Sequence, residues 1–114
     1  MEERKRRIAL NEMVFREVNE QIEGLTSGVL QVGDDETMSI VCECGEITCA
    51  ERLTTTVSDY ESIRSDALLF FVLPGHELPD VEDVVEQTDA YLVVRKRPEA
   101  IGGKIAVEHD PRSN

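Results

Sequence analysis

The chain has 114 residues, of which 32% are charged and 40% are hydrophobic, and its formal net charge is −12. This length predicts one domain with a modest core, and the apolar fraction excludes a disordered chain. The strong negative charge disfavours binding to nucleic acid or to anionic membranes.

Basic residues are concentrated at the N-terminus. Residues 2–7 hold four of the twelve basic residues and two of the 24 acidic ones, so the rest of the chain carries −14. An arm formed by Arg4, Lys5, Arg6 and Arg7 can contact phosphate, but a solubilising helix start is the simpler interpretation. No apolar segment typical of a signal peptide follows the arm, and no stretch approaches the roughly 20 apolar residues that span a bilayer. We therefore expect a cytoplasmic protein without membrane contact.

Residues 2–25 predict a helix, because apolar residues recur at spacings that mark one helical face. These residues are Ile8, Phe15, Val18, Ile22 and Leu25. Written as heptads, Asn11 occupies a seam position, where an Asn can specify pairing register, so a homodimer through this helix is one hypothesis. We favour an amphipathic helix that packs on the protein's own sheet. Gly24 and Gly28 weaken and then stop the helix.

Residues 26–36 predict a loop with an acidic turn at 33–36. The turn lacks the spaced carboxylates and the closing Glu of an EF-hand loop, so we interpret it as solvated surface. Residues 37–42 then predict a strand, with Met38, Ile40 and Cys42 on one face. The β-branched residues at 52–57 predict a returning strand. Together the two strands predict a hairpin with the cysteines at its tip.

A short helix and a buried strand follow. Ser58 and Glu61 have the Ser-x-x-Glu spacing of a capping box, which predicts a helix over about residues 59–65. Residues 67–73 form a continuous apolar run that ends at Pro74-Gly75, and its length and flanks predict a buried strand.

The segment at 79–94 allows two interpretations. Val81, Val84 and Val85 fit a helical turn, but they equally suit a strand that turns through Thr88 and Asp89 into a second strand at 91–94. We favour the hairpin.

The fold class predicted from these elements is α+β. A long N-terminal helix and one short helix pack on a small, mainly antiparallel sheet. Residues 1–96 form the single domain. The glycines and prolines after Arg97 predict a loosely attached tail over residues 97–114.

All three cysteines lie within eight residues, as Cys42, Cys44 and Cys49. Thiolates bind soft or borderline metals, and a Cys-x-Cys pair directs two sulfurs at one ion. Because three cysteines cannot all pair and no export signal is visible, a reducing compartment and a metal fit better than disulfides. Gly45 tolerates the positive φ that a knuckle turn requires.

A zinc site needs a fourth ligand, and the chain has two histidines. His76 directly follows the predicted buried strand, in a Pro-Gly turn that presents its side chain rigidly, whereas His109 lies in the predicted tail. We favour His76. The resulting Cys3His site is closed, which is typical of structural zinc. Glu77 or a backbone carbonyl is a candidate acceptor for the second N–H of the imidazole.

Other uses of the cluster remain open from sequence. They are a [2Fe–2S] cluster, a disulfide attacked by the third thiol, three reduced cysteines without metal, and a hydrolase with an open zinc position. Glu43 and Glu46 argue against the redox reading, because neighbouring carboxylates raise thiol pKa. We expect a non-enzymatic protein, because the sequence shows no triad, phosphate-binding glycine loop or His-Glu-x-x-His motif.

Five segments carry a pattern that extends over about residues 14–96. They are Phe15–Glu23, Val41–Cys49, Leu53–Glu61, Pro74–Glu77 and Tyr91–Lys96. In these segments the chain resembles a set of small uncharacterised actinobacterial proteins. The resemblance implies that the cysteines and His76 belong to one module, and it implies no activity. The run at 54–57 departs from the more charged strand expected there, which affects the surface and not the ligands.

These patterns predict a structural zinc held by Cys42, Cys44, Cys49 and His76, which ties the hairpin tip to the end of the central strand. The expected role is a protein-interaction or regulatory module that contacts its partner through the N-terminal helix or the acidic surface. A redox or [2Fe–2S] sensor is the first alternative. A nucleic-acid-associated factor is the second.

Overall fold

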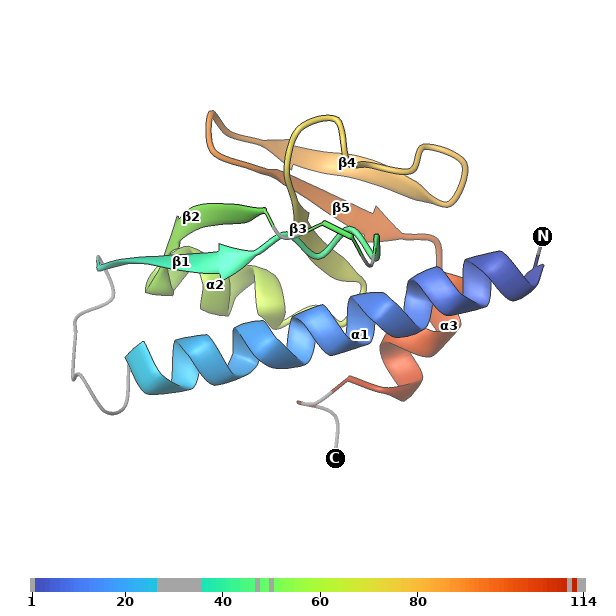
Figure 1. Ribbon diagram of the computed structural model, residues 1–114, viewed down its shortest axis with the longest axis horizontal. Helices are drawn as coiled ribbons and strands as arrows, with labels where there is room; N and C mark the ends of the chain where they lie inside the picture. Colours follow the sequence, from blue (N-terminus) through green and yellow to red (C-terminus); the bar gives the residue numbers. More distant parts are fainter. Residues whose placement is uncertain (1, 27–35, 47, 50, 111, 113–114) are drawn as a thin grey trace.

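The computed structural model describes residues 2–26, 36–46, 48–49, 51–110 and 112. The elements are α1 (Glu2–Gly24), β1 (Thr37–Val41), β2 (Arg52–Thr56), α2 (Val57–Arg64), β3 (Leu69–Val72), β4 (Glu82–Gln87), β5 (Leu92–Lys96) and α3 (Ile101–Glu108) (Figure 1). The fold is α+β, as predicted, with two short helices where we expected one. Most of the predicted loop at 26–36, including Gly28, lies outside the described residues.

The strands form two small antiparallel sheets. β1 pairs with β2, with Ile40 opposite Leu53, which confirms the predicted hairpin. The second sheet has the order β3-β5-β4, so the buried strand before His76 is an edge strand and β5 is the central one. β4 and β5 pair directly, and Thr88 donates its N–H to the Tyr91 carbonyl across the turn at 2.9 Å. The hairpin interpretation of residues 79–94 is therefore confirmed.

The hydrophobic core lies on both sides of β3, because successive side chains of a strand point to opposite faces. The Phe71 ring stacks on Tyr60, with centroids 5.4 Å apart, and meets Tyr91 edge-on at 5.2 Å. Phe70 belongs to a second buried cluster, which also contains Cys42 and other residues of the knuckle. The cysteine segment is therefore an extension of the core.

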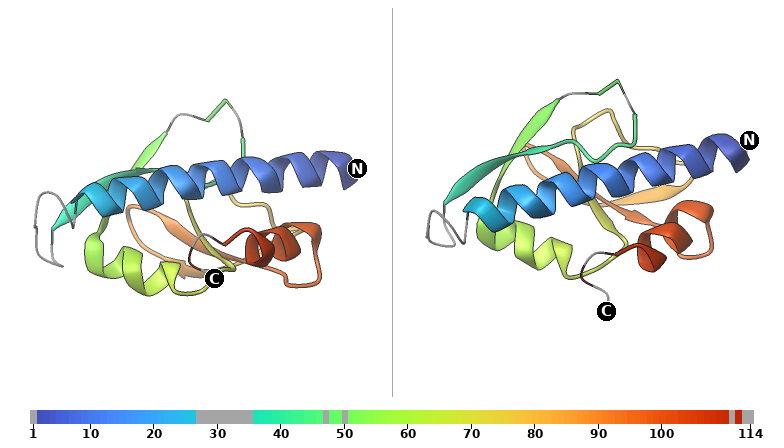
Figure 2. Two further views of the ribbon diagram at one scale, coloured as in Figure 1. Left: turned by 90° about the horizontal axis from the view of Figure 1, so that it is seen from below. Right: turned by 60° about the horizontal axis from the view of Figure 1, so that its bottom comes forward.

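Helix α1 runs along the molecule, with α2 and α3 on one side of it (Figure 2). The face that it buries is mostly polar, which contradicts the predicted apolar stripe. Its buried residues are Ala9, Glu12, Arg16, Asn19 and Glu23. Ile8, Phe15 and Ile22 are only half-buried. Within the described part of the chain, no helix combines the length and the apolar character that crossing a bilayer demands.

The buried charges of α1 have partners far along the chain. Lys96 Nζ donates to Glu12 Oε2 and to Glu82 Oε1, both at 2.5 Å. The guanidinium of Arg16 lies 4.0 Å from the centroid of the Phe70 ring, a cation–π contact. Burial raises the pKa of Glu12 to about 7, against the opposing attraction of Lys96. Ion pairs and cation–π contacts therefore attach α1 to the rest of the fold.

Helix α2 begins earlier than predicted. Its N-cap is Thr56, whose Oγ1 accepts a hydrogen bond from the Asp59 N–H at 3.0 Å, so the predicted capping role of Ser58 is wrong. Thr and Ser are both effective N-caps. A helix that begins at Val57 buries the Val57 side chain in the core, and this burial favours Thr56 over Ser58 as the N-cap.

Residues 101–108, which we expected in a loosely attached tail, form helix α3. The helix buries Ile105 and Ala106, and beyond it Arg112 Nε pairs with Glu20 Oε1 of α1 at 2.7 Å. Gly103 disfavours a helix by propensity, but a Cβ there would collide with the backbone of Arg97. The close packing of Gly103 against the backbone of Arg97 is a tertiary contact that local propensity does not include. This contact explains why the sequence predicted a tail instead of a helix.

Candidate metal centre

The three cysteines lie at the tip of the β1–β2 hairpin. Cys42 follows β1 and donates its N–H to the Glu51 carbonyl at 3.0 Å, which extends the pairing by one residue. The backbone then turns at Gly45, whose φ is +80°, as expected for a knuckle. A hydrogen bond of 2.9 Å from the Cys49 N–H to the Glu46 carbonyl closes the turn. The segment therefore folds back on itself and gathers its sulfurs.

His76 approaches the same point from the turn after β3. This turn contains Gly75 at a φ of +92°. His76 Nδ1 lies 3.5 Å from Cys42 Sγ and 3.7 Å from Cys49 Sγ. The ligand atoms of Cys42, Cys44, Cys49 and His76 all lie within 4.8 Å of one another. The fold therefore brings together the four residues singled out from the sequence.

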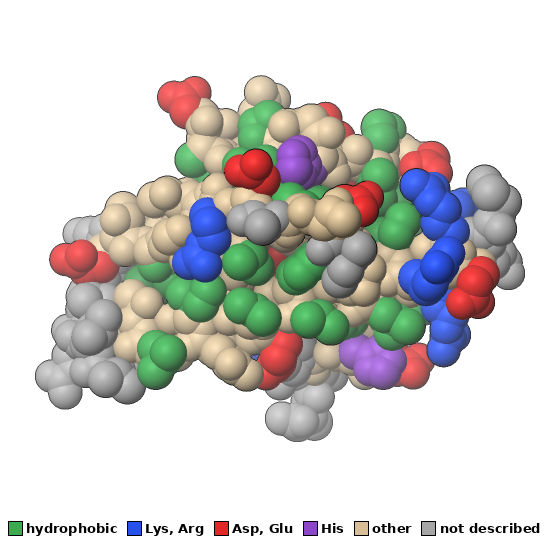
Figure 3. Space-filling view, viewed as in Figure 1, with side chains coloured by type: hydrophobic (Ala, Val, Ile, Leu, Met, Phe, Trp, Pro, Cys, Tyr) green, Lys and Arg blue, Asp and Glu red, His purple; other side chains and the backbone are tan. Residues whose placement is uncertain are grey.

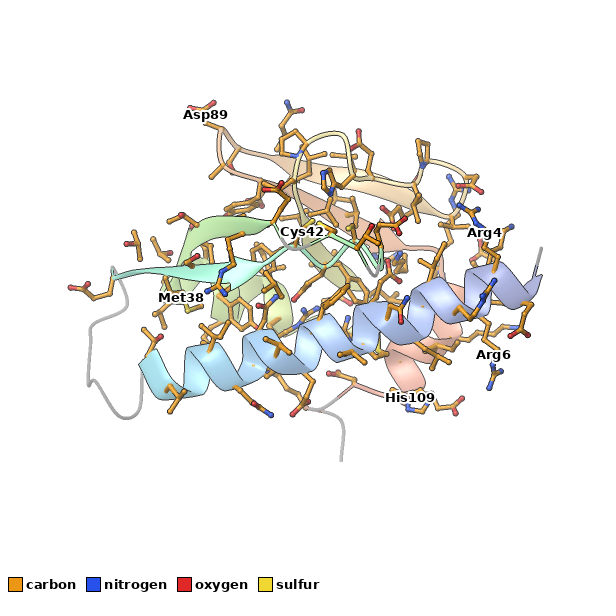
Figure 4. The ribbon with its side chains drawn as sticks, viewed as in Figure 1. Arg4, Arg6, Met38, Cys42, Asp89 and His109 are labelled. Atoms are coloured by element: carbon orange, nitrogen blue, oxygen red, sulfur yellow. The ribbon has the colours of Figure 1, made fainter. Side chains whose placement is uncertain are left out.

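The second histidine lies elsewhere. His109 is the C-cap of α3, with half of its side chain exposed and its Nε2 3.6 Å from Glu108 Oε1. Figure 4 shows His109 below α1 and Cys42 above it. Glu77, a predicted partner of the imidazole, accepts a hydrogen bond from the Gly75 N–H at 2.8 Å and so stabilises the turn before His76.

The spacing of the ligand atoms suits one tetrahedral ion. With Zn–S bonds of about 2.3 Å and Zn–N bonds of about 2.05 Å, a tetrahedral angle places sulfur and nitrogen about 3.6 Å apart. The two sulfur–nitrogen distances at His76, 3.5 and 3.7 Å, lie on either side of that value. Since Cys42 and Cys44 are buried and Cys49 and His76 half-buried, the group could hold an ion largely shielded from solvent.

The three thiols share hydrogen bonds that set their ionisation. A hydrogen bond from Cys42, assisted by a backbone bond from Glu46, lowers the pKa of Cys44 to about 5. The same bond, together with burial, raises the pKa of Cys42. Burial raises the pKa of Cys49. Leu73 also donates its N–H to Cys42 Sγ at 3.3 Å. The lowered pKa of Cys44 favours its thiolate, the form that binds metal.

Glu43, between two of the cysteines, anchors the knuckle and is fully buried. Its Oε1 accepts hydrogen bonds from the Phe71 N–H at 3.0 Å and from Arg64 Nη1 at 3.3 Å. Its Oε2 accepts one from Asn19 Nδ2 at 2.7 Å. The sequence interpretation treated Glu43 as a carboxylate acting on the thiols, whereas its charge is paired with Arg64. Sequence reasoning missed this role because none of these partners is a neighbour in the chain.

Helix α1 supports the knuckle directly. A Cβ on Gly45 would lie 2.7 Å from Ile8 Cγ2 and 2.8 Å from the Ile8 carbonyl oxygen, so glycine is needed for the close approach as well as for its φ. Asn11 Nδ2 donates to the Gly45 carbonyl at 3.1 Å. The Asn19 side chain pairs with the end of β1, since its Oδ1 accepts from the Val41 N–H at 2.8 Å. Asn11 therefore serves the protein's own fold.

The basic arm forms the first turns of α1, with its side chains exposed. Arg4 and Lys5 line a cavity of about 270 Å³ between α1 and the start of α3. Glu12 and Glu99 line the same cavity, so its charge is mixed. Figure 3 shows basic side chains grouped at this end of the molecule. The mixed lining does not favour phosphate as a ligand.

Comparisons with protein-family models, with curated proteins and with solved structures give no match to this chain.

Proposed function

We propose that Cys42, Cys44, Cys49 and His76 bind one Zn²⁺ ion as a structural site. The observation that carries this proposal is the mutual distance of the four ligand atoms, none more than 4.8 Å from another. The distances from His76 Nδ1 to two of the sulfurs both match the distance expected between two ligands of one tetrahedral zinc ion. One ion serves both contacts, whereas a [2Fe–2S] cluster divides its four ligands between two irons. The geometry therefore supports a mononuclear site.

The proposed ion would link the two sheets. The knuckle belongs to the β1–β2 hairpin, and His76 follows β3 of the other sheet. The Glu43 N–H donates a backbone hydrogen bond of 2.8 Å to the Phe71 carbonyl, which marks the same junction. The free energy of metal binding would then contribute to folding, as in other small metal-dependent domains. The sequence predicted that the ion ties the hairpin tip to the central strand. In the structure the strand before His76 is β3, an edge strand, so the ion would tie the hairpin tip to an edge strand instead.

The function that best fits such a site is a non-enzymatic interaction or regulatory module. Three cysteines and one histidine complete the preferred coordination of zinc and leave no position for a substrate or a water nucleophile. The ion would stabilise a surface that binds another protein. Proteins that co-purify with the tagged wild-type chain should be lost with the His76→Ala variant and kept with His109→Ala. An identical set of bound proteins for both variants would contradict a metal-dependent module.

Elemental analysis of protein purified without added metal tests the site. We expect one equivalent of zinc in the wild-type chain and in His109→Ala, the matched histidine control, and a large loss in Cys44→Ser and His76→Ala. Iron with visible absorbance would support the [2Fe–2S] alternative. Full zinc content in His76→Ala would indicate an open site with three cysteine ligands. Absence of metal from the wild-type chain would contradict the proposal.

A further inference from the structure

Helix α1 presents an apolar stripe to solvent, on the face opposite its buried polar residues. The stripe consists of Leu10, Val14, Val18 and Leu25, which are 38%, 58%, 39% and 61% exposed. Their spacings of four, four and seven residues place them on one side of the helix. Figure 3 shows hydrophobic side chains in a row along α1. The helix is thus amphipathic in the reverse sense, with charges inside and aliphatic groups outside.

The stripe differs from scattered surface hydrophobics. Seven large hydrophobic residues are exposed within the described part of the chain, and four of them belong to this stripe. Isolated exposed residues need no explanation, but a contiguous apolar row marks an interaction surface. It overlaps only partly with the seam suggested by the heptad pattern, because Val18 and Leu25 belong to both whereas Asn11, Phe15 and Ile22 of the seam are partly buried.

The exposed charges beside the stripe divide α1 into two halves. Arg4, Lys5, Arg6 and Arg7 are exposed in the first turns, where they outnumber the exposed Glu3. Glu17 is exposed in the second half, and Glu20 of the same half lies beside it, paired with Arg112. A helix that is basic at one end and acidic at the other is complementary to a reversed copy of itself. Figure 4 shows Arg4 and Arg6 at the start of the helix, which fixes this polarity along the molecule.

We propose that a second copy of this chain packs antiparallel on the stripe, about a two-fold axis that passes beside Val14. Leu10 of each copy then meets Val18 of the other, and Arg7 lies opposite Gln21 of the other copy, about one helical turn from Glu17. A parallel arrangement would bring the two basic ends together and the two acidic halves together. Antiparallel pairing avoids this repulsion and also aligns the helix dipoles favourably. In a chain of net charge −12, it places basic groups where the two copies meet.

The anchoring of α1 makes such a pairing feasible. A helix of 23 residues is about 34 Å long, at 1.5 Å per residue. Most of the stability of a helix in a protein comes from tertiary contacts, and α1 is already fixed by its buried ion pairs and hydrogen bonds. Association therefore does not have to order the helix, which lowers its entropic cost. The pairing involves the face of α1 turned away from the knuckle, so the inference stands independently of the zinc proposal.

Sedimentation equilibrium of the purified full chain tests the proposal. We expect a dimer in wild-type protein, and a dissociation constant raised about tenfold or more in Val14→Glu, because two carboxylates then face each other across the axis. Val85→Glu is the matched control, since Val85 is 53% exposed on β4, which Figure 1 shows on the far side of the molecule. A wild-type chain that stays monomeric at about 100 µM, or equal effects of the two variants, would overturn the proposal.

Charge reversal tests the orientation. In the antiparallel dimer Arg7→Glu should weaken association, and combining it with Glu17→Lys in one chain should restore it, because the exchanged charges again attract each other. In a parallel dimer Arg7→Glu would relieve repulsion between the basic ends. Stronger association of Arg7→Glu alone would therefore overturn the antiparallel arrangement.

Discussion

The contact between Gly45 and α1 allows a quantitative test, because the chain offers a matched second glycine. Gly45 and Gly75 both have positive φ, +80° and +92°, and each is adjacent to a proposed ligand. A Cβ on Gly45 would lie 2.8 Å from the Ile8 carbonyl oxygen, a backbone atom that cannot rotate away, whereas a Cβ on Gly75 would meet nothing within 4 Å. The two substitutions by alanine therefore share the backbone cost and differ in the steric one.

The backbone cost of alanine at positive φ is about 1–2 kcal/mol. Forcing a methyl group into a packed contact adds about 1–3 kcal/mol. We expect Gly75→Ala to lower the free energy of unfolding by about 1–2 kcal/mol and Gly45→Ala by about 2–5 kcal/mol. Urea unfolding followed by circular dichroism, at one fixed zinc concentration, measures both values. Equal losses in the two variants would refute the packing of the knuckle on α1.

Three further predictions concern the buried polar groups, and urea unfolding measures each of them. Lys96→Met leaves two buried carboxylates without their cation and should cost about 3–5 kcal/mol. Arg95 is exposed, so Arg95→Met, the control, should change stability by less than about 0.5 kcal/mol. Because burial raises the pKa of Glu12 from 4.5 to about 7, its ionisation opposes folding. The free energy of unfolding of the wild-type chain should therefore be greatest below pH 4.5 with respect to this group, and should fall as pH rises to about 7. Glu12→Gln lacks this titration, so it should gain stability relative to wild type over that range. A constant difference between the two would contradict this. Asn19→Ala leaves the end of β1 and the Glu43 carboxylate short of partners and should cost about 2–4 kcal/mol; a loss below about 1 kcal/mol would show that water replaces the amide.

Patterns that depend on local chemistry predicted most of the fold. The alternation at 37–42, the β-branched run at 52–57 and the apolar run at 67–73 each contain a strand of the structure. The dense cysteine cluster and the Pro-Gly turn before His76 pointed to residues that the fold brings within 4.8 Å of one another. These signals act over a few residues, so the sequence displays them directly.

The errors arise where distant contacts override local pattern. The hydrophobic stripe assigned to the inner face of α1 is not that face, because Glu12 finds Lys96, and Asn19 finds Glu43, only after the chain has folded. A hydrophobicity pattern assumes that charges face water, and paired buried charges break that assumption. Helix α3 was not predicted for a similar reason, because Gly103 is needed for close packing against Arg97 rather than for a turn.

X-ray absorption at the zinc edge, on protein purified without added metal, tests the central claim most directly. The proposed site predicts three sulfur atoms at about 2.3 Å and one nitrogen at about 2.05 Å from a single zinc ion. In His76→Ala the nitrogen contribution from imidazole should disappear, and in His109→Ala the spectrum should not change. A zinc ion bound mainly by oxygen, or a wild-type spectrum without an imidazole nitrogen, would contradict a closed site formed by Cys42, Cys44, Cys49 and His76.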